Sequence, residues 1–222
     1  RSPMLGYDNF DRELTEAQRS AYAAEGRKPV LRLRMPDEDL SWHDLVRGQT
    51  TFAAGTVPDF ALTRASGDPL YTLVNPVDDA LMKITHVLRG EDLLPSTPKH
   101  LLIAQAMGAP EPVYAHLSLL TGPDGAKLSK RHGATSLRAY RDEGILPEAM
   151  RNYLAILGWS PGSDEEIVSL EAMVARFDLG AVSKNPAVFD VTKLEWMNGV
   201  YIRSLGPGEF AACALPFVEK AL

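Results

Sequence analysis

The segment Lys127-Leu128-Ser129-Lys130-Arg131 carries the residues best suited to chemistry. It follows a Gly122-Pro123-Asp124-Gly125 turn, which places it on an exposed loop. Each lysine is a compact ammonium on a flexible stem, which suits a phosphate that moves during a reaction. From Lys127 to Arg141 there are five basic residues and no acidic ones, although the net charge of the chain is -6. The loop is therefore either a phosphate site or a solvated basic loop.

Two earlier segments place polar side chains after predicted strands. The first, Leu70 to Asp79, carries an aromatic hydroxyl and an amide where a strand should end and a helix begin, at Tyr71 and Asn75. Ligands of open α/β sheets bind at such ends. Asp79 is better interpreted as a helix-start residue that complements the dipole.

Arg89 follows a second short apolar strand. Its planar fork could clamp a carboxylate in two-pronged fashion. It could equally form a salt bridge with Glu91 or Asp92, and the spacing alone leaves both possibilities open.

Other catalytic patterns fail in this sequence. There is no G-x-G-x-x-G, and Lys127 lacks the Gly-Lys-Ser/Thr core of a P-loop. The single Cys213 excludes an internal disulfide and a zinc site built on several cysteines, and we expect it half-buried in a helix. The histidines show no metal-ligand spacing and are each interpreted as structural or solvated: His43, His86, His100, His116 and His132.

The composition bounds the class of protein. With 222 residues, 45% hydrophobic and 23% charged, the chain fits one large domain or two to three small ones of a globular protein. No apolar run of about 18 residues occurs, so we expect no membrane span and a cytosolic location. The net charge of -6 argues against broad nucleic-acid binding but permits a local basic surface that meets phosphates.

The elements around these segments change character along the chain. The first 70 or so residues are predicted to be strand-rich after one capped helix, with a helix at 15–25, a strand at 30–34, a hairpin at 42–52 and strands at 59–64 and 70–74. The next part alternates, with a helix at 77–84, a strand at 86–88, a helix at 96–107 and a strand at 113–120. This order predicts about half of a parallel α/β sheet. The remainder is predicted helical, at 137–142, 147–157, 170–177, 192–201 and 207 to the end.

Three segments together resemble bacterial glutamyl-tRNA synthetases. They are the run from Arg89 to Pro98, the segment Lys127 to Arg131, and Trp196-Met197-Asn198-Gly199. The middle one resembles the KMSKS loop of class I aminoacyl-tRNA synthetases. The resemblance covers essentially the whole chain in the family's order.

The resemblance implies an α/β fold with four parts. These are most of a strand-rich α+β acceptor-binding insertion (1–69), the second half of the Rossmann catalytic domain (70–118), a helical stem-contact domain (119–205) and the start of an anticodon-binding domain (206–222). It also implies ATP-dependent activation of L-glutamate to glutamyl-adenylate and transfer to the 3′ end of tRNA(Glu). Its implied setting is a cytoplasmic monomer that uses magnesium with ATP, for which no protein ligand can be assigned, and no zinc in this stretch.

The same resemblance implies roles for individual residues. Lys130 would stabilise the departing pyrophosphate, with support from Lys127, Leu128, Ser129 and Arg131 in the same ATP-binding loop. Tyr71 and Arg89 would contact the glutamate side chain, with Asn75 on the same wall. Asp92 falls where the tRNA acceptor end meets the active site.

The family's HIGH-type motif has no counterpart in these 222 residues. We therefore expect the chain to be a fragment that does not form adenylate at a useful rate alone, which ATP–pyrophosphate exchange on the isolated chain would test. Two related enzymes are alternatives, glutaminyl-tRNA synthetase and glutamyl-queuosine tRNA synthetase. A non-catalytic module that only holds a tRNA acceptor stem is the alternative from another class.

Overall fold

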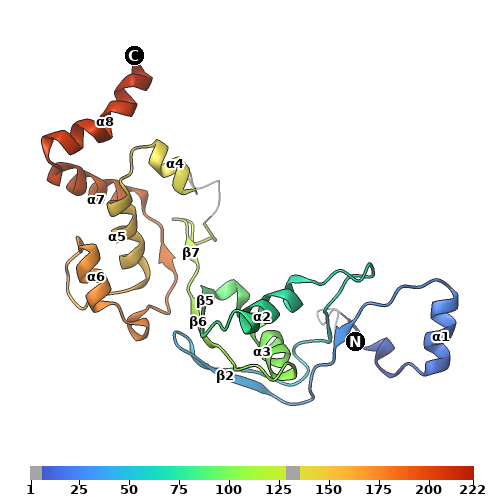
Figure 1. Cartoon of the computed structure of the whole chain (residues 1–222). Coiled ribbons are helices and arrows are strands. Elements are labelled where there is room, and N and C mark those ends of the chain that lie inside the picture. The colour runs from blue at the N-terminus through green and yellow to red at the C-terminus, as the bar shows by residue number, and fades with distance from the viewer. Residues whose placement is uncertain (1–6, 129–135) are drawn as a thin grey trace. The chain divides into compact units, whose positions relative to one another are not determined.

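The computed structural model describes residues 7–128 and 136–222, and the chain divides into two compact units, Arg1–His116 and Leu117–Leu222 (Figure 1). The first unit begins with two short helices, η1 (Phe10–Glu13) and α1 (Glu16–Ala24). The predicted capping box of α1 is confirmed, because the Gln18 amide N–H donates to Thr15 Oγ1 over 3.3 Å and the Thr15 amide N–H donates to Gln18 Oε1 over 2.9 Å. Gly26 follows at φ +75°, which explains why α1 ends there.

A two-stranded antiparallel sheet follows α1, from β1 (Arg32–Leu33) and β4 (Phe60–Ala61). Both strands are shorter than the predicted 30–34 and 59–64. A partly buried ion pair joins the loops around them. Arg12 donates from Nε and Nη2 to the two carboxylate oxygens of Asp59, each over 2.8 Å, and the Met35 amide donates to the same carboxylate. This ion pair fixes the loops, because the short β1–β4 pairing cannot do so alone.

The main sheet of the first unit has four strands in the order β3-β2-β6-β5. Their bounds are β2 Leu40–Asp44, β3 Gly48–Phe52, β5 His86–Gly90 and β6 Val113–Leu117. The predicted hairpin is confirmed as the antiparallel pair β2–β3, and β2 also pairs in parallel with β6 at Asp44 and Tyr114. The hairpin therefore shares one sheet with β5 and β6, although it precedes the predicted boundary at residue 69. The boundaries themselves stay predictions.

The strand predicted at 70–74 is wrong. Helix α2 runs over Tyr71–Leu81, with Pro76 inside it. Leu70 stands at the N-cap and has no side-chain oxygen to cap the helix, so the sequence carries no start signal. Pro76 looks like a boundary but is tolerated, because it is the buried residue of α2 and packing offsets its missing N–H. Asp79 consequently lies near the end of the helix, and its predicted role at a helix start is wrong.

Two further elements complete this unit, η2 (Glu91–Ser96) and α3 (Thr97–Ala106). Helix α3 ends before Gly108, as predicted, and packs beside α2 (Figure 1). The two sides of α3 contribute to two different hydrophobic clusters. Ile103 packs with Met35, Phe60 and Leu62, whereas Leu101 packs with Trp42 and Tyr114 of the main sheet. Helix α3 therefore joins the small and the main sheet.

The second unit is helical, as predicted, with one small parallel sheet. The strands are β7 Leu120–Thr121 and β8 Ala187–Val188, and the helices are α4 Leu137–Asp142, α5 Pro147–Gly158, α6 Leu170–Arg176, η4 Leu179–Ala181, α7 Val191–Ser204 and α8 Pro207–Ala221. Its core holds Tyr140, Met150, Tyr153, Phe189, Leu194 and Met197.

A buried amide in α5 holds the second unit together. Asn152 is fully buried; its Oδ1 accepts from the Val168 amide (2.9 Å) and from Tyr201 Oη (2.8 Å), and its Nδ2 donates to the Glu166 carbonyl (3.0 Å).

Replacement Asn152→Ala leaves all three groups without this partner. We expect it to lower the local unfolding free energy by roughly 2–4 kcal/mol. Hydrogen exchange at the Val168 amide measures this loss. Tyr201→Phe removes one hydroxyl hydrogen, which Asn152 Oδ1 (2.8 Å) and the Val168 carbonyl (3.3 Å) share, and should cost about 1 kcal/mol. Unchanged exchange in Asn152→Ala would contradict this reading.

Three simpler observations complete the fold. Within the described ranges no helix is long and apolar enough to cross a membrane. Nor do residues 7–128 and 136–222 hold a group of three His, Cys, Asp or Glu side chains able to bind a metal ion. Cys213 lies in α8, as predicted, but is exposed and not half-buried, because α8 contributes no buried residue in this structure.

Candidate active site

Helix α2 presents a polar stripe, because Tyr71, Asn75 and Asp79 are spaced four residues apart and so share one face. Tyr71 is 58% exposed, and its ring meets the ring of His100 edge-on with centroids 6.3 Å apart. The Oδ1 atom of Asn75 is buried and accepts no hydrogen bond from the described residues. Burial raises the pKa of Asp79, against the opposing charge of Arg89. The stripe therefore faces the surroundings of Arg89.

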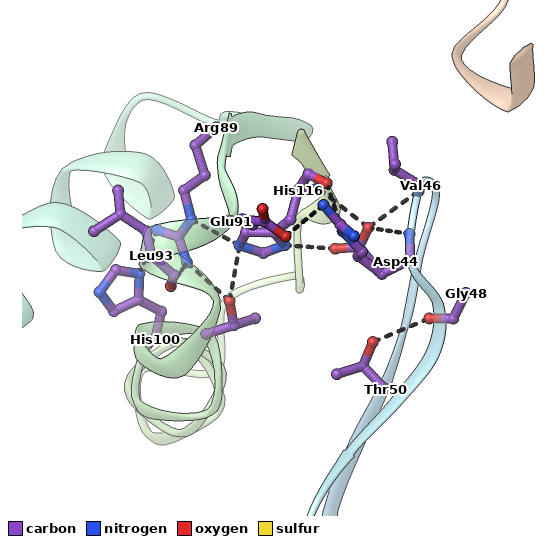
Figure 2. A network of polar contacts seen from close by, with 11 residues as sticks. Asp44, Val46, Gly48, Thr50, Arg89, Glu91, Leu93, His100 and His116 are labelled. Carbon is purple, nitrogen blue, oxygen red and sulfur yellow. Dashed lines mark hydrogen bonds and ion pairs between the residues drawn. The ribbon is translucent and has the colours of Figure 1, made fainter. Parts of the chain in front are cut away.

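Arg89, the penultimate residue of β5, is the centre of a polar network (Figure 2). Its Nε donates to His116 Nε2 (3.0 Å) and its Nη1 to His100 Nδ1 (3.3 Å). Its Nη2 donates to Thr97 Oγ1 (2.9 Å) and to the Leu93 carbonyl (3.3 Å). Burial lowers the pKa of Arg89, but an arginine remains charged at neutral pH. The acceptors described for this cation are all neutral groups.

The side of the network nearest the hairpin is a buried Asp44–His116 pair. Neither side chain is exposed, and the His116 Nδ1 donates to Asp44 Oδ2 over 2.5 Å. Asp44 Oδ1 accepts from three backbone amides, those of Val46 (3.0 Å), Arg47 (2.9 Å) and His116 (3.1 Å). Burial raises the pKa of Asp44, but these hydrogen bonds outweigh it and hold the pKa below its usual value. The carboxylate is therefore charged.

The hydrogen bonds fix the protonation of His116. Its Nδ1 must carry the proton, because Asp44 offers only acceptors, and its Nε2 must carry the lone pair, because Arg89 Nε offers only a donor. If both ring nitrogens carried a proton, His116 Nε2 and Arg89 Nε would be two donors only 3.0 Å apart. Burial lowers the pKa of His116 and outweighs the opposing effect of the hydrogen bond that the ring donates to Asp44, in agreement with the neutral ring.

His100 is a second neutral imidazole beside Arg89. Burial, followed by the charges of Arg89 and Lys99, lowers its pKa to about 4. An unfolded histidine has a pKa near 6.5, so between about pH 4 and 6.5 the unfolded chain binds more protons than the folded one. We therefore expect the first unit to lose stability as the pH falls through this window. The NMR shift of the His100 ring Cε1 proton should stay constant from pH 8 to 5, and a midpoint near 6.5 would contradict this assignment.

The structure excludes one of the two interpretations left open for Arg89, the salt bridge with Glu91 or Asp92. Glu91 pairs with a different arginine, since Arg47 Nη2 lies 2.5 Å from Glu91 Oε2. Arg47 also donates from Nε to the His116 carbonyl (3.2 Å). Asp92 lies beside Glu91 in η2, and its side chain is not among the four acceptors described for Arg89. The first unit thus brings Tyr71 and Arg89 to His100, while Asn75 shares the face of α2 that carries Tyr71.

The basic segment belongs to the second unit. The chain turns at Gly125, with φ +72°, and the Leu128 amide then donates to the Leu120 carbonyl over 2.9 Å, while Lys127 pairs with Thr121. Lys127 is exposed, and Leu128 packs against the core of the second unit. Ser129, Lys130 and Arg131 lie outside the described residues. The described portion is therefore a tight turn, as predicted, whose return arm pairs with β7.

Sequence reasoning missed the residues that hold Arg89. His116 and His100 were interpreted one by one as structural or solvated, and Asp44 and Thr97 drew no attention. The available signal was the histidine within the apolar strand Val113–Leu117, because a buried ring must find hydrogen-bond partners. Its partners could not be named, since Asp44 lies 72 residues away.

Comparison with known proteins supplies the family. A family profile described as "tRNA synthetases class I (E and Q), catalytic domain" matches residues 3–196. The chain belongs to this family. Membership confirms the resemblance to class I synthetases and the mixed α/β fold of their catalytic domain.

Relatives of this class I family member are close in sequence. A "Glutamate--tRNA ligase" of Mycobacterium ulcerans (strain Agy99) is 61% identical over 217 residues, which are 96% of this chain and 44% of that protein. A "Glutamate--tRNA ligase" of Mycolicibacterium smegmatis is 60% identical over 217 residues, 96% of this chain and 45% of that protein. The chain thus spans less than half the length of the curated relatives that it matches.

Solved structures of this family agree with the fold. The crystal structure of a glutamate tRNA ligase from Elizabethkingia meningosepticum CCUG26117, in complex with its amino acid, has a TM-score of 0.83 and 37% identity, over 97% of this chain and 47% of that one. That of the glutamate-tRNA synthetase from Elizabethkingia anophelis has a TM-score of 0.84 and 37% identity, over 97% and 48%.

Proposed function

We propose that this chain is part of a glutamate–tRNA ligase, which activates L-glutamate with ATP and transfers it to the 3′ end of tRNA(Glu). The proposal rests on the family, on the relatives' names and on one feature of the site. That feature is a charged Arg89 held by neutral acceptors, so its positive charge is not cancelled by a direct carboxylate partner among the described residues. An unneutralised, half-buried guanidinium is complementary to a carboxylate.

Arg89 is proposed to recognise the γ-carboxylate of glutamate together with Tyr71 and Asn75. Four of the five N–H groups of Arg89 already donate to described residues, which leaves one hydrogen of Nη1 for a ligand. To clamp a carboxylate with two N–H groups, Arg89 would have to release one of its hydrogen bonds. The bond to His100 is a candidate, because at 3.3 Å it is longer than the bonds to His116 and Thr97. The side chain of glutamine carries no charge and would therefore bind Arg89 less well than that of glutamate. The buried Asn75 Oδ1 accepts no hydrogen bond from the described residues and would be available to an N–H donor of the bound amino acid.

The remaining site assignments are proposals from the resemblance. Residues 127–131 would hold the ATP phosphates, with Lys130 on the departing pyrophosphate. Asp92 would lie near the tRNA acceptor end. Magnesium would accompany ATP, and no protein ligand is assigned to it. The four domain ranges, a cytoplasmic location and a monomeric state belong to the same proposal.

The first unit also offers a surface for nucleic acid, in the range proposed to bind the acceptor stem. A cavity of about 910 Å³ is lined by Arg12, Arg19, Arg27, Lys28, Arg32 and Arg34, among others. Arg27 stacks over the ring of Tyr22 at 4.3 Å, and Arg32 over Tyr7 at 4.0 Å. Cations interleaved with aromatic rings suit phosphates and bases.

Removing charge from this cavity should weaken tRNA binding in a salt-dependent way. For the double replacement Arg19→Gln and Lys28→Gln in the full-length protein, we expect the slope of log K against log salt to shrink by about 2. Filter binding of tRNA between 50 and 200 mM salt measures it. Lys83→Asn, which removes an exposed cation of the first unit outside this cavity, is the control and should leave the slope nearly unchanged. An unchanged slope in the double variant would contradict the assignment of this surface.

The proposed function is tested by ATP–pyrophosphate exchange, with tRNA present, on the full-length protein that contains this chain. Exchange with glutamate, absent with glutamine and followed by charging of tRNA(Glu), is the expected result. Exchange with glutamine instead would favour glutaminyl-tRNA synthetase. Glutamate activation followed by transfer to a queuosine base would favour the queuosine-modifying relative, and tRNA binding without exchange would favour a non-catalytic module.

A further inference from the structure

We propose that Asp44 and His116 are positioning residues that fix the guanidinium of Arg89 for the carboxylate of its substrate. This inference deepens the proposed function and rests on it, because it takes glutamate as the ligand of Arg89. Neither residue is proposed to touch the substrate. Both act through the network in Figure 2, which connects the β2–β3 hairpin to β5.

The pair is anchored far more firmly than a solvated histidine would be. Asp44, His116 and Thr97 are all completely buried, and Asp44 uses both oxygens, one for three backbone amides and the other for the ring. Arg47 closes the arrangement, because it joins the His116 carbonyl to Glu91 of η2. The imidazole therefore has one orientation available to it.

The orientation of the imidazole dictates that of Arg89. His116 Nε2 is the acceptor for Arg89 Nε, while Thr97 Oγ1 and the Leu93 carbonyl hold Nη2. These three contacts fix the guanidinium plane at two of its three nitrogens. The third, Nη1, donates one hydrogen to the His100 ring, which Tyr71 also contacts, and keeps its other hydrogen for a ligand. A plane fixed in advance loses less entropy when a carboxylate binds.

The replacement Asp44→Asn tests this chain of contacts with little change of shape. Oδ1 of the new amide can still accept from the three backbone amides, so its NH2 group must face His116 Nδ1. Nδ1 would then have to accept, and the proton would move to Nε2, where it would oppose the Arg89 Nε–H across 3.0 Å. The variant therefore turns the acceptor of Arg89 into a donor.

The experiment uses the full-length protein and measures ATP–pyrophosphate exchange at varied glutamate and at varied ATP. For Asp44→Asn we expect the KM for glutamate to rise about tenfold or more, with the KM for ATP within twofold of wild type. Imidazole ¹⁵N NMR should show the proton of His116 on Nδ1 in wild type and on Nε2 in the variant. Asp39→Asn is the control, because Asp39 also accepts a backbone amide, that of Ala54 over 2.8 Å, but is exposed.

A second pair of variants covers the case in which Asp44→Asn does not fold. His116→Gln keeps a carbonyl that can accept from Arg89 Nε, and His116→Leu does not. We expect the leucine variant to raise the KM for glutamate at least tenfold and the glutamine variant to recover most of that loss. Equal effects of the two, or equal rises for glutamate and ATP, would overturn the proposal. Failure of all these variants to fold would overturn it too, by assigning the pair to the fold alone.

The outcomes also separate this proposal from the proposed function. If wild type shows no glutamate-dependent exchange, the proposed function fails, whereas the NMR assignment of His116 still reports on the pair. If wild type is active and folded Asp44→Asn keeps its KM for glutamate within twofold, the function stands and the positioning role is overturned.

Discussion

Replacing Lys130 with alanine in the full-length protein is expected to slow glutamyl-adenylate formation by roughly 10²–10³-fold. The physical reason is that negative charge builds on the departing pyrophosphate, and an ammonium placed in advance stabilises that charge in the transition state. The measurement is the single-turnover rate of adenylate formation with saturating ATP and glutamate. Affinity for tRNA should change little.

The matched control is Arg138→Ala, because Arg138 is an exposed cation of the same basic stretch but lies beyond the loop, in α4. It should leave the rate of adenylate formation within about threefold. If Lys130→Ala instead kept the rate and lost salt-sensitive tRNA affinity, the loop would bind tRNA and not stabilise pyrophosphate.

Replacing Arg89 with leucine is expected to lower kcat/KM for glutamate by roughly 30-fold to several thousandfold, equivalent to about 2–5 kcal/mol for the loss of one partner of a buried charged pair. The preference for glutamate over glutamine should fall with it, because the charge proposed to distinguish the two side chains is removed. Exchange kinetics with both amino acids measure the two effects. Arg89→Lys should not restore activity, since an ammonium cannot bond to His116, Thr97 and Leu93 in one plane.

Lys83→Asn is the control for Arg89→Leu. Lys83 is an exposed cation of the same unit, and asparagine tolerates its φ of +58°. An unchanged preference for glutamate in Arg89→Leu, with Lys83→Asn also unchanged, would remove Arg89 from the substrate site and leave it a structural role.

The helical unit was the part most accessible to prediction, because its start signals are local. Ser136, Ser169 and Asp190 each cap a helix with a side-chain oxygen, and Pro147 occupies the first turn of α5. Helix α2 lacks such a signal at Leu70 and contains a proline, so its start was misplaced. Here the packing of buried Pro76 outweighed the local preference of proline to end a helix.

The candidate site was predictable only in its individual residues. Tyr71, Asn75 and Arg89 were proposed from the sequence, and the structure adds that Tyr71 and Arg89 both contact His100. The supporting Asp44–His116 pair was out of reach, because spacing along a chain does not reveal which buried histidine meets which carboxylate when the two lie on different strands.

The sequence separation of that pair has a consequence for folding. The contact between Asp44 and His116 closes a loop of 72 residues, and the same strands carry the parallel pairing of β2 with β6. Closing so long a loop costs chain entropy before any contact offsets it, so pairings of this kind form slowly. During synthesis Arg89 leaves the ribosome well before His116 does. A nascent chain that ends before residue 116 therefore contains Arg89 without its His116 acceptor, and that contact forms only when β6 joins the sheet.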